Sequence, residues 1–206
     1  MTDAEFMNSI TTDSSFMREA IAEAAEGIHA GHGGPFGSVI VRSGEIVGRG
    51  HNRVLINHDP TCHGEVAAIR DAGARLKTHD LSGCELYTTG EPCPMCLCAC
   101  MWANIEKVYY GCSLDENAEI GFRDEKLNRV MNSLRNDERF EDTDQSTKSS
   151  GSSISASEPQ NNSGQSQGDE FNSVEPENPD DYLEQVDHEA CKLLFDEYMR
   201  INHTIY

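Results

Sequence analysis

The stretch PTCHGEVAAIR, residues 60–70, places a histidine and a glutamate at the start of a predicted helix. Apolar side chains then recur at helical spacing up to about Leu76. His63 is a candidate zinc ligand, and Glu65, two positions further in the same turn, can approach a coordinated water without binding the metal. Because the helix dipole also stabilises an ordinary acidic residue in a first turn, Glu65 taken alone does not decide between the two interpretations.

A second stretch, EPCPMC at residues 91–96, supplies two thiols at the start of another predicted helix. A helix N-terminus favours negative charge and lowers the pKa of a thiol, so Cys93 and Cys96 suit a metal ion. With His63 they make three ligands and leave the fourth tetrahedral position open for water, as a catalytic zinc requires. A closed structural site would need a fourth ligand, and three nearby cysteines keep that alternative open: Cys62, Cys98 and Cys100.

Helix and strand patterns alternate along residues 13–135. Asp13 and Ser14 are candidate N-caps of a first amphipathic helix, and Ser43 and Gly44 suit the turn of a β-hairpin. Further elements are expected in the order helix, strand, helix, strand, helix, at residues 63–76, 84–89, 94–103, 107–111 and 124–134. This alternation predicts an α/β fold in which helices cover both faces of a sheet, a three-layer α/β/α sandwich.

Composition divides the chain into three parts. Residues 1–140 are the predicted catalytic domain. Residues 141–181 are acidic and rich in Ser, Gln, Asn and Pro, with too few apolar side chains to offset the entropy of ordering, which predicts a disordered linker. Residues 182–206 regain helical periodicity from Tyr182 onward and predict a helix that packs on the catalytic domain or on a partner subunit.

The formal net charge of −20 bears on partners and location. A polyanion such as nucleic acid would be repelled, so we expect a small-molecule substrate and no nucleic acid. No segment approaches the roughly 20 apolar residues that cross a bilayer, and the N-terminal sequence lacks the features of a signal peptide. We therefore expect no membrane association and a cytoplasmic location, where the eight cysteines would stay reduced.

The combination of H-x-E with P-C-x-x-C is the pattern of zinc nucleobase deaminases. The chain resembles the cytidine deaminase superfamily and, within it, most resembles bacterial-type guanine deaminases. The motifs that carry the resemblance are GGPFG (33–37), GHN (50–52), DPTCHGEVAAIR (59–70), YTTGEPCPMC (87–96) and AEIGF (118–122). The resemblance implies a mixed five-stranded sheet, one Zn²⁺ with a bound water or hydroxide on His63, Cys93 and Cys96, and Glu65 as the proton shuttle.

The resemblance also implies substrate contacts. It assigns a hydrogen bond with the base to Asn52, an aromatic wall to Phe36, a carboxylate for the N–H groups of guanine to Asp124, and a substrate contact to Gly64. Each of the first three has an alternative from local structure alone, since an asparagine can cap a turn, a phenylalanine can belong to the core, and an aspartate can cap a helix.

The C-terminal segment, which ends in Tyr206, is implied by the resemblance to cover the active site of its own or a neighbouring subunit. A homodimer, with or without an exchanged tail, is the expected assembly. The linker is long enough for either arrangement and does not distinguish them.

The reaction that the resemblance implies is the hydrolytic deamination of guanine to xanthine and ammonia, a step of purine catabolism. Deamination of cytosine, guanosine or a pterin stays open, because GRGHN at 48–52 also resembles cytosine deaminases and pocket size is not legible in a sequence. A tRNA adenosine deaminase fits less well, since the chain lacks a basic patch for an RNA stem. An inactive, deaminase-like binding module would be expected to lack the glutamate or a ligand, and neither is lacking.

Overall fold

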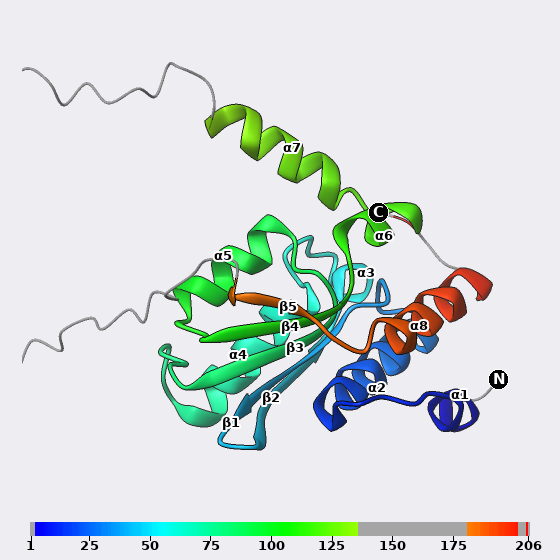
Figure 1. Cartoon of the computed structure of the whole chain (residues 1–206), viewed down its shortest axis with the longest axis horizontal. Coiled ribbons are helices and arrows are strands. Elements are labelled where there is room, and N and C mark those ends of the chain that lie inside the picture. Colours follow the sequence, from blue (N-terminus) through cyan, green and yellow to red (C-terminus); the bar gives the residue numbers. More distant parts are fainter. Residues whose placement is uncertain (1–2, 136–180, 202–204, 206) are drawn as a thin grey trace, which may run out of the picture.

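The computed structural model describes residues 3–135, 181–201 and 205 of the chain (Figure 1). The predicted linker at residues 141–181 lies outside the described residues except for Asp181, and Tyr206 also lies outside them. The division into catalytic domain, linker and tail therefore stays a prediction.

Five strands form one mixed sheet: β1 (Gly37–Arg42), β2 (Glu45–His51), β3 (Cys84–Gly90), β4 (Lys107–Cys112) and β5 (Leu183–Gln185). Their order across the sheet is β2-β1-β3-β4-β5, with β1 antiparallel to β2 and β3, and with β3, β4 and β5 parallel. The β1–β2 hairpin turns at Ser43 and Gly44, whose φ angles of 52° and 79° suit a two-residue turn with positive φ at both positions. The implied mixed five-stranded sheet is confirmed.

Four long helices cover the two faces of this sheet, α2 (Ser15–His29) and α8 (His188–Arg200) on one and α4 (Gly64–Leu76) and α5 (Pro94–Trp102) on the other (Figure 1). Successive side chains of a strand point to opposite faces, so the neighbours Val39 and Ile40 of β1 are both fully buried but belong to different cores. Apolar burial on both faces gives the three-layer α/β/α sandwich that the alternation of elements predicts.

Helix α4 lies unusually close to β2 because the strand carries glycines where the two elements meet. A Cβ on Gly48 would lie 2.6 Å from the backbone oxygen of Ala68, and a Cβ on Gly50 would lie 2.5 Å from its backbone nitrogen. No side chain larger than hydrogen fits at these distances. The glycines thereby set how closely the start of α4, which carries His63 and Glu65, approaches the sheet.

Three short helices were not expected from the sequence, namely α1 (Asp3–Ser9), α3 (Val54–Asn57) and α6 (Leu114–Glu119). They have between four and seven residues, too few for a periodic apolar stripe. Helix α7 (Asp124–Arg135) begins at the predicted residue and extends away from the sheet (Figure 1).

The tail departs from its predicted single helix. Leu183–Gln185 forms β5, a short strand beside β4, and the helix begins only at His188. The backbone N–H of Val186 donates to the carbonyl of Tyr110, so the tail satisfies polar groups on the edge of β4 that a helix would leave unpaired. Asp187, with φ of 52°, separates the two elements, and its carboxylate accepts the backbone N–H groups of Asp13 and Ser14 before α2. The tail is thus anchored to both the sheet and α2.

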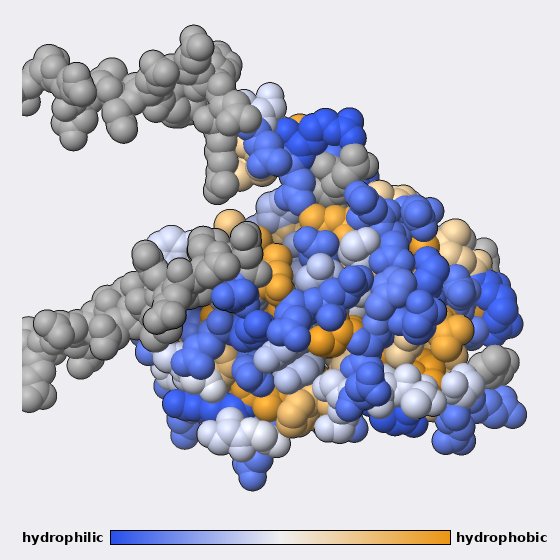
Figure 2. Space-filling view, in the orientation of Figure 1, coloured by the Kyte–Doolittle hydropathy of each residue, from blue (hydrophilic) through white to orange (hydrophobic). Residues whose placement is uncertain are grey.

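The visible surface is mostly hydrophilic (Figure 2). Hydrophilic residues cover most of the face in Figure 2, where hydrophobic residues form small separate patches. Within the described residues, no helix combines the length and the apolar character needed to span a membrane.

Candidate active site

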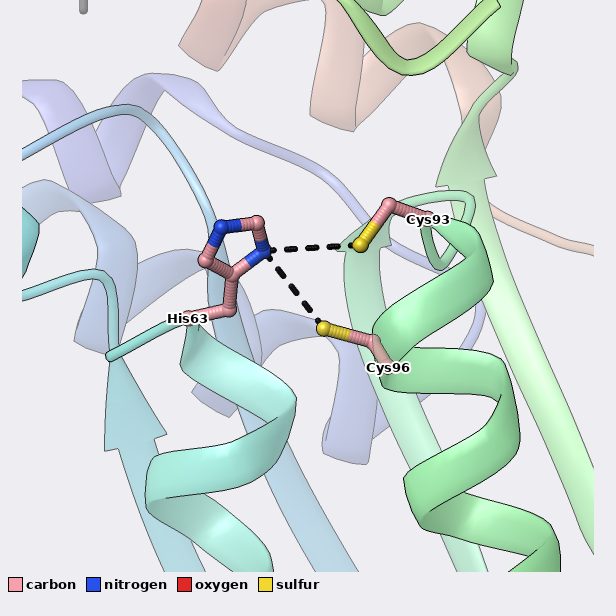
Figure 3. Close-up of side chains that lie close together, drawn as sticks. All are labelled: His63, Cys93 and Cys96. Atoms are coloured by element: carbon pink, nitrogen blue, oxygen red, sulfur yellow. Dashed lines mark hydrogen bonds between the residues drawn. The ribbon is translucent and has the colours of Figure 1, made fainter. Parts of the chain in front are cut away.

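The three predicted metal ligands come together at the starts of two helices. His63 is the N-cap of α4, Cys93 is the N-cap of α5, and Cys96 lies in the first turn of α5. The Nδ1 atom of His63 lies 3.7 Å from the sulfur of Cys93 and 3.5 Å from that of Cys96 (Figure 3). Zinc bonded to nitrogen and sulfur at a tetrahedral angle would place these atoms about 3.6 Å apart. The side chains therefore have the spacing of a zinc ligand set.

Among the described residues, the cluster contains three candidate ligands and no fourth. The ligand atoms of His63, Cys93 and Cys96 lie within 4.8 Å of one another. The sulfur of Cys62 instead donates to Asp59 at 3.1 Å. The other two candidates are also placed elsewhere: Cys98 is exposed, and Cys100 is buried in the core between α4, α5 and the sheet. The geometry thus favours an open, catalytic site over a closed structural one.

The surroundings of the Cys93 and Cys96 thiols shift their pKa values in opposite directions. A hydrogen bond from Cys96, helped by His63, lowers the pKa of Cys93 to about 4 against the cost of burial, while the same bond and burial raise the pKa of Cys96. A divalent ion bound to both sulfurs would displace the proton of this hydrogen bond. A thiolate and imidazole donor set of this kind suits zinc.

Glu65 lies beside the cluster and is almost completely buried, with 5% of its surface exposed. Burial is the largest influence and raises the pKa of its carboxyl to about 7, with the Cys93 thiolate adding to the rise and His63 opposing it. A hydrogen bond joins the carboxyl to Cys96. Glu65 is not one of the three grouped ligands, so it stands where a group that takes up and releases a proton next to the metal would be needed.

A pocket of about 310 Å³, here called the inner pocket, opens at the cluster. Its lining comprises the ligands His63 and Cys93 and six further residues: Phe36, Asn52, Glu65, Glu91, Asn117 and Phe122. The side-chain oxygen of Asn52 accepts the backbone N–H of Val54 at 3.2 Å, which orients the amide. The structure therefore brings Phe36 and Asn52 to the same hollow as the cluster and Glu65.

The remaining predicted contacts are placed differently. Gly64 does not line the inner pocket; a Cβ there would lie 2.8 Å from the backbone oxygen of Phe36, so the glycine allows α4 to pack on β1. Asp124 is the first residue of α7, but its side chain and Tyr206 lie outside what the structure describes.

Residues 10–112 match the protein family described as the cytidine and deoxycytidylate deaminase zinc-binding region. The chain belongs to this family. The match contains the three predicted metal ligands and Glu65, so the family predicted from the sequence is confirmed, and the sheet and helices described above agree with the cytidine deaminase-like fold.

The relatives of this deaminase include proteins with two different names. It is 48% identical over 110 residues to a guanine deaminase of Bacillus subtilis (strain 168), a match that covers 53% of this chain and 70% of that protein. A crystal structure of guanine deaminase from Bacillus subtilis aligns with a TM-score of 0.55 and 44% identity, over 58% of this chain and 76% of that one. A tRNA-specific adenosine deaminase of Aquifex aeolicus is 45% identical over 95 residues, covering 46% and 62% of the two chains.

Three residues that line the inner pocket of this deaminase had been given no role from the sequence: Glu91, Asn117 and Phe122. Glu91 accepts the N–H of Leu114 on its carboxylate at 3.0 Å and the amide of Asn117 on its backbone oxygen at 3.3 Å, which ties α6 to the zinc loop. Glu91 lies in the motif EPCPMC and Phe122 in the motif AEIGF, so the sequence carries a signal for both residues. Asn117 has no such signal, because its partner Glu91 is 26 residues away.

Proposed function

We propose that this deaminase hydrolyses guanine to xanthine and ammonia. The observation that carries the proposal is the cluster of His63, Cys93 and Cys96, open on one side, with Glu65 buried beside it in a pocket of about 310 Å³. We choose guanine as the base because the chain is 48% identical in sequence to a guanine deaminase.

Glu65 carries the proton transfers in this proposal. Zinc held by the three ligands supplies a water that is acidic near neutral pH. Glu65 would accept one proton of that water as the water oxygen bonds to the carbon bearing the amino group of guanine, and would pass this proton to the ring nitrogen. The carboxylate would then take the remaining proton of the added hydroxyl and give it to the amine, so that the carbon–nitrogen bond breaks and ammonia and xanthine leave. A carboxyl whose pKa burial raises to about 7 can serve in both directions.

The pocket walls hold the base. Asn52 is 1% exposed and its amide is oriented by Val54, so it can hydrogen-bond the base without first being ordered. Phe36 supplies an apolar face to the ring. We include Asp124, at the start of α7, as the carboxylate for the N–H groups of guanine.

For the assembly we propose a cytoplasmic homodimer that acts in purine catabolism, in which the segment ending at Tyr206 covers the inner pocket. Helix α8 packs on α2 and β4 of its own chain, which supports a tail that stays with its own subunit. Mixing a zinc-site variant with a tail-truncated chain tests this. Recovered activity in the mixture would mean that the tail is exchanged between subunits.

The direct test is ammonia release from guanine, guanosine, cytosine and adenine by the zinc-loaded protein. Turnover of guanine above the other three is the expected result. Turnover of cytosine instead would overturn the choice of base and leave the zinc chemistry in place.

A tRNA adenosine deaminase is the second candidate, because of the 45% identity with one such enzyme. The net charge of −20 opposes it, since RNA binding needs basic surface. Conversion of adenosine in a tRNA anticodon stem-loop, with no reaction on guanine, would reverse the order of the two proposals.

A further inference from the structure

Two hollows meet at the metal cluster, and Phe122 stands where they adjoin. The inner pocket is about 310 Å³. A second space of about 610 Å³, here called the outer hollow, shares His63, Cys93 and Phe122 with it. The other residues around the outer hollow are Pro60, Met95, Arg123 and Leu127. Two of these three shared residues, His63 and Cys93, are the proposed metal ligands. Phe122 is therefore the shared part of the wall that can be substituted without removing a metal ligand.

The ring of Phe122 is held in this position by aromatic contacts. Its centroid lies 4.8 Å from that of Phe36 in an edge-to-face arrangement and 6.1 Å from that of Tyr198. Only 8% of the residue is exposed, although the outer hollow beside it is open enough to leave Met95 and Leu127 38% and 50% exposed. A packed ring thus lines both of the adjoining spaces.

The backbone around Phe122 also fixes its place. The N–H of Phe122 donates to the carbonyl of Asn117 at 3.0 Å, and Gly121 before it has φ of +102°. Residues with a Cβ rarely adopt this conformation, so the glycine provides the turn that brings the ring back over the pocket after α6 ends. Ring and turn together place the Phe122 side chain where the inner pocket and the outer hollow adjoin.

We propose that Phe122 is the size filter that restricts this deaminase to free bases. A nucleoside is a base with a ribose on one ring nitrogen, and in this proposal a base at the cluster occupies the inner pocket, so that the ribose must extend into an adjoining space. The outer hollow is the adjoining space that would accept it, and the Phe122 ring occupies the passage. This inference rests on the proposed function and extends it by naming the residue that excludes nucleosides.

The test compares kcat/KM for guanine and for guanosine in the wild type and in Phe122→Ala. Joining the two hollows is expected to lower the preference for guanine by roughly 10- to 100-fold, the scale on which shape alone discriminates substrates. Phe195→Ala is the matched control. It removes another buried ring that packs edge-to-face on Phe36, at 5.8 Å, but lines neither hollow, so the preference is expected to stay unchanged.

The outcomes separate the two proposals. No turnover of guanine by the wild type overturns the proposed function and the filter with it. Efficient guanine turnover with equal use of guanosine by the wild type, or an unchanged preference in Phe122→Ala, overturns the filter alone. If the alanine variant does not fold, Phe122→Leu, which keeps an apolar side chain of smaller extent, decides by the same ratio, with a smaller but measurable fall expected.

Discussion

The two sides of the inner pocket are built in different ways. The metal side is formed by the starts of α4 and α5, where His63, Cys93 and Cys96 occupy N-cap or first-turn positions. A second side is formed by Asn117 and Phe122, which reach the pocket through a hydrogen bond to distant backbone and through ring packing. The predicted metal ligands thus depend on short spacings within each helix start, whereas Asn117 and Phe122 depend on long-range contacts. Changes to the metal side should abolish the reaction, whereas changes to the side of Asn117 and Phe122 should alter its selectivity.

The largest effect is expected from losing a metal ligand. Cys93→Ser should reduce bound zinc well below one ion per chain and abolish ammonia release, because a serine hydroxyl is a far poorer zinc ligand than a thiolate. Metal analysis and activity measured on the same sample check this. Cys98→Ser is the matched control, since Cys98 is in the same helix but exposed, and it should keep both zinc and activity. Full activity in Cys93→Ser would show that the cluster is not the catalytic centre.

Glu65→Gln should remove the proton shuttle while leaving the ligand set intact. We expect kcat to fall by about 10²- to 10⁴-fold, the usual contribution of a positioned acid–base group, with the zinc content unchanged. Loss of zinc in this variant would instead make Glu65 part of the metal site. Retained zinc with undiminished turnover would show that the Glu65 carboxyl takes no part in the reaction. The burial of Glu65 would then have no catalytic explanation.

The contrast between the two sides also explains what the sequence could and could not predict. His63, Cys93 and Cys96 were predictable because a ligand at a helix start is defined by residues three or fewer positions away. The strand β5 was missed because three residues have no distinctive period, and their conformation depends on the free edge of β4. Asn117 was missed because its place in the pocket depends on Glu91, far away in the sequence.

On the substrate side, Asn52→Asp separates binding from local structure. In the wild type the N–H of Val54 donates to the side-chain oxygen of Asn52 at 3.2 Å; the aspartate keeps such an oxygen but loses the amide donor. A lost hydrogen bond to a base costs about 1–3 kcal/mol, so kcat/KM for guanine should fall roughly 5- to 150-fold while the fold is kept. Steady-state kinetics with a thermal unfolding control check this. Unchanged kcat/KM would assign Asn52 to the turn alone.

The smallest effect is expected where the tail meets the substrate side. Glu116, next to Asn117 in α6, accepts hydrogen bonds from His188 at 2.7 Å and Lys192 at 3.2 Å of α8, and from the backbone of Ser113 at 2.9 Å. Burial opposes ionisation of Glu116, but these bonds outweigh it and lower its pKa to about 2. Hydrogen bonding to Glu116 raises the pKa of His188. The hydrogen bonds of Glu116 thus join α6 to the tail, most strongly when Glu116 is ionised and His188 is protonated.

The pH dependence of this link follows from the two directions. The Glu116 contribution is present above its ordinary pKa of 4.5 and is lost as the pH falls toward 2. The His188 contribution is complete below its ordinary pKa of 6.5 and is lost as the pH rises through its higher value in the folded protein. Glu116→Gln should therefore lower the free energy of unfolding most between pH 4.5 and 6.5. For this partly exposed pair the expected loss is about 1 kcal/mol, or roughly 2–4 °C in Tm. Glu189→Gln is the control, because Glu189 contacts the other ring nitrogen of His188 but is 92% exposed. A Tm difference between Glu116→Gln and the wild type that does not vary with pH would mean that the link is held by packing of α8, and that the charges add nothing to it.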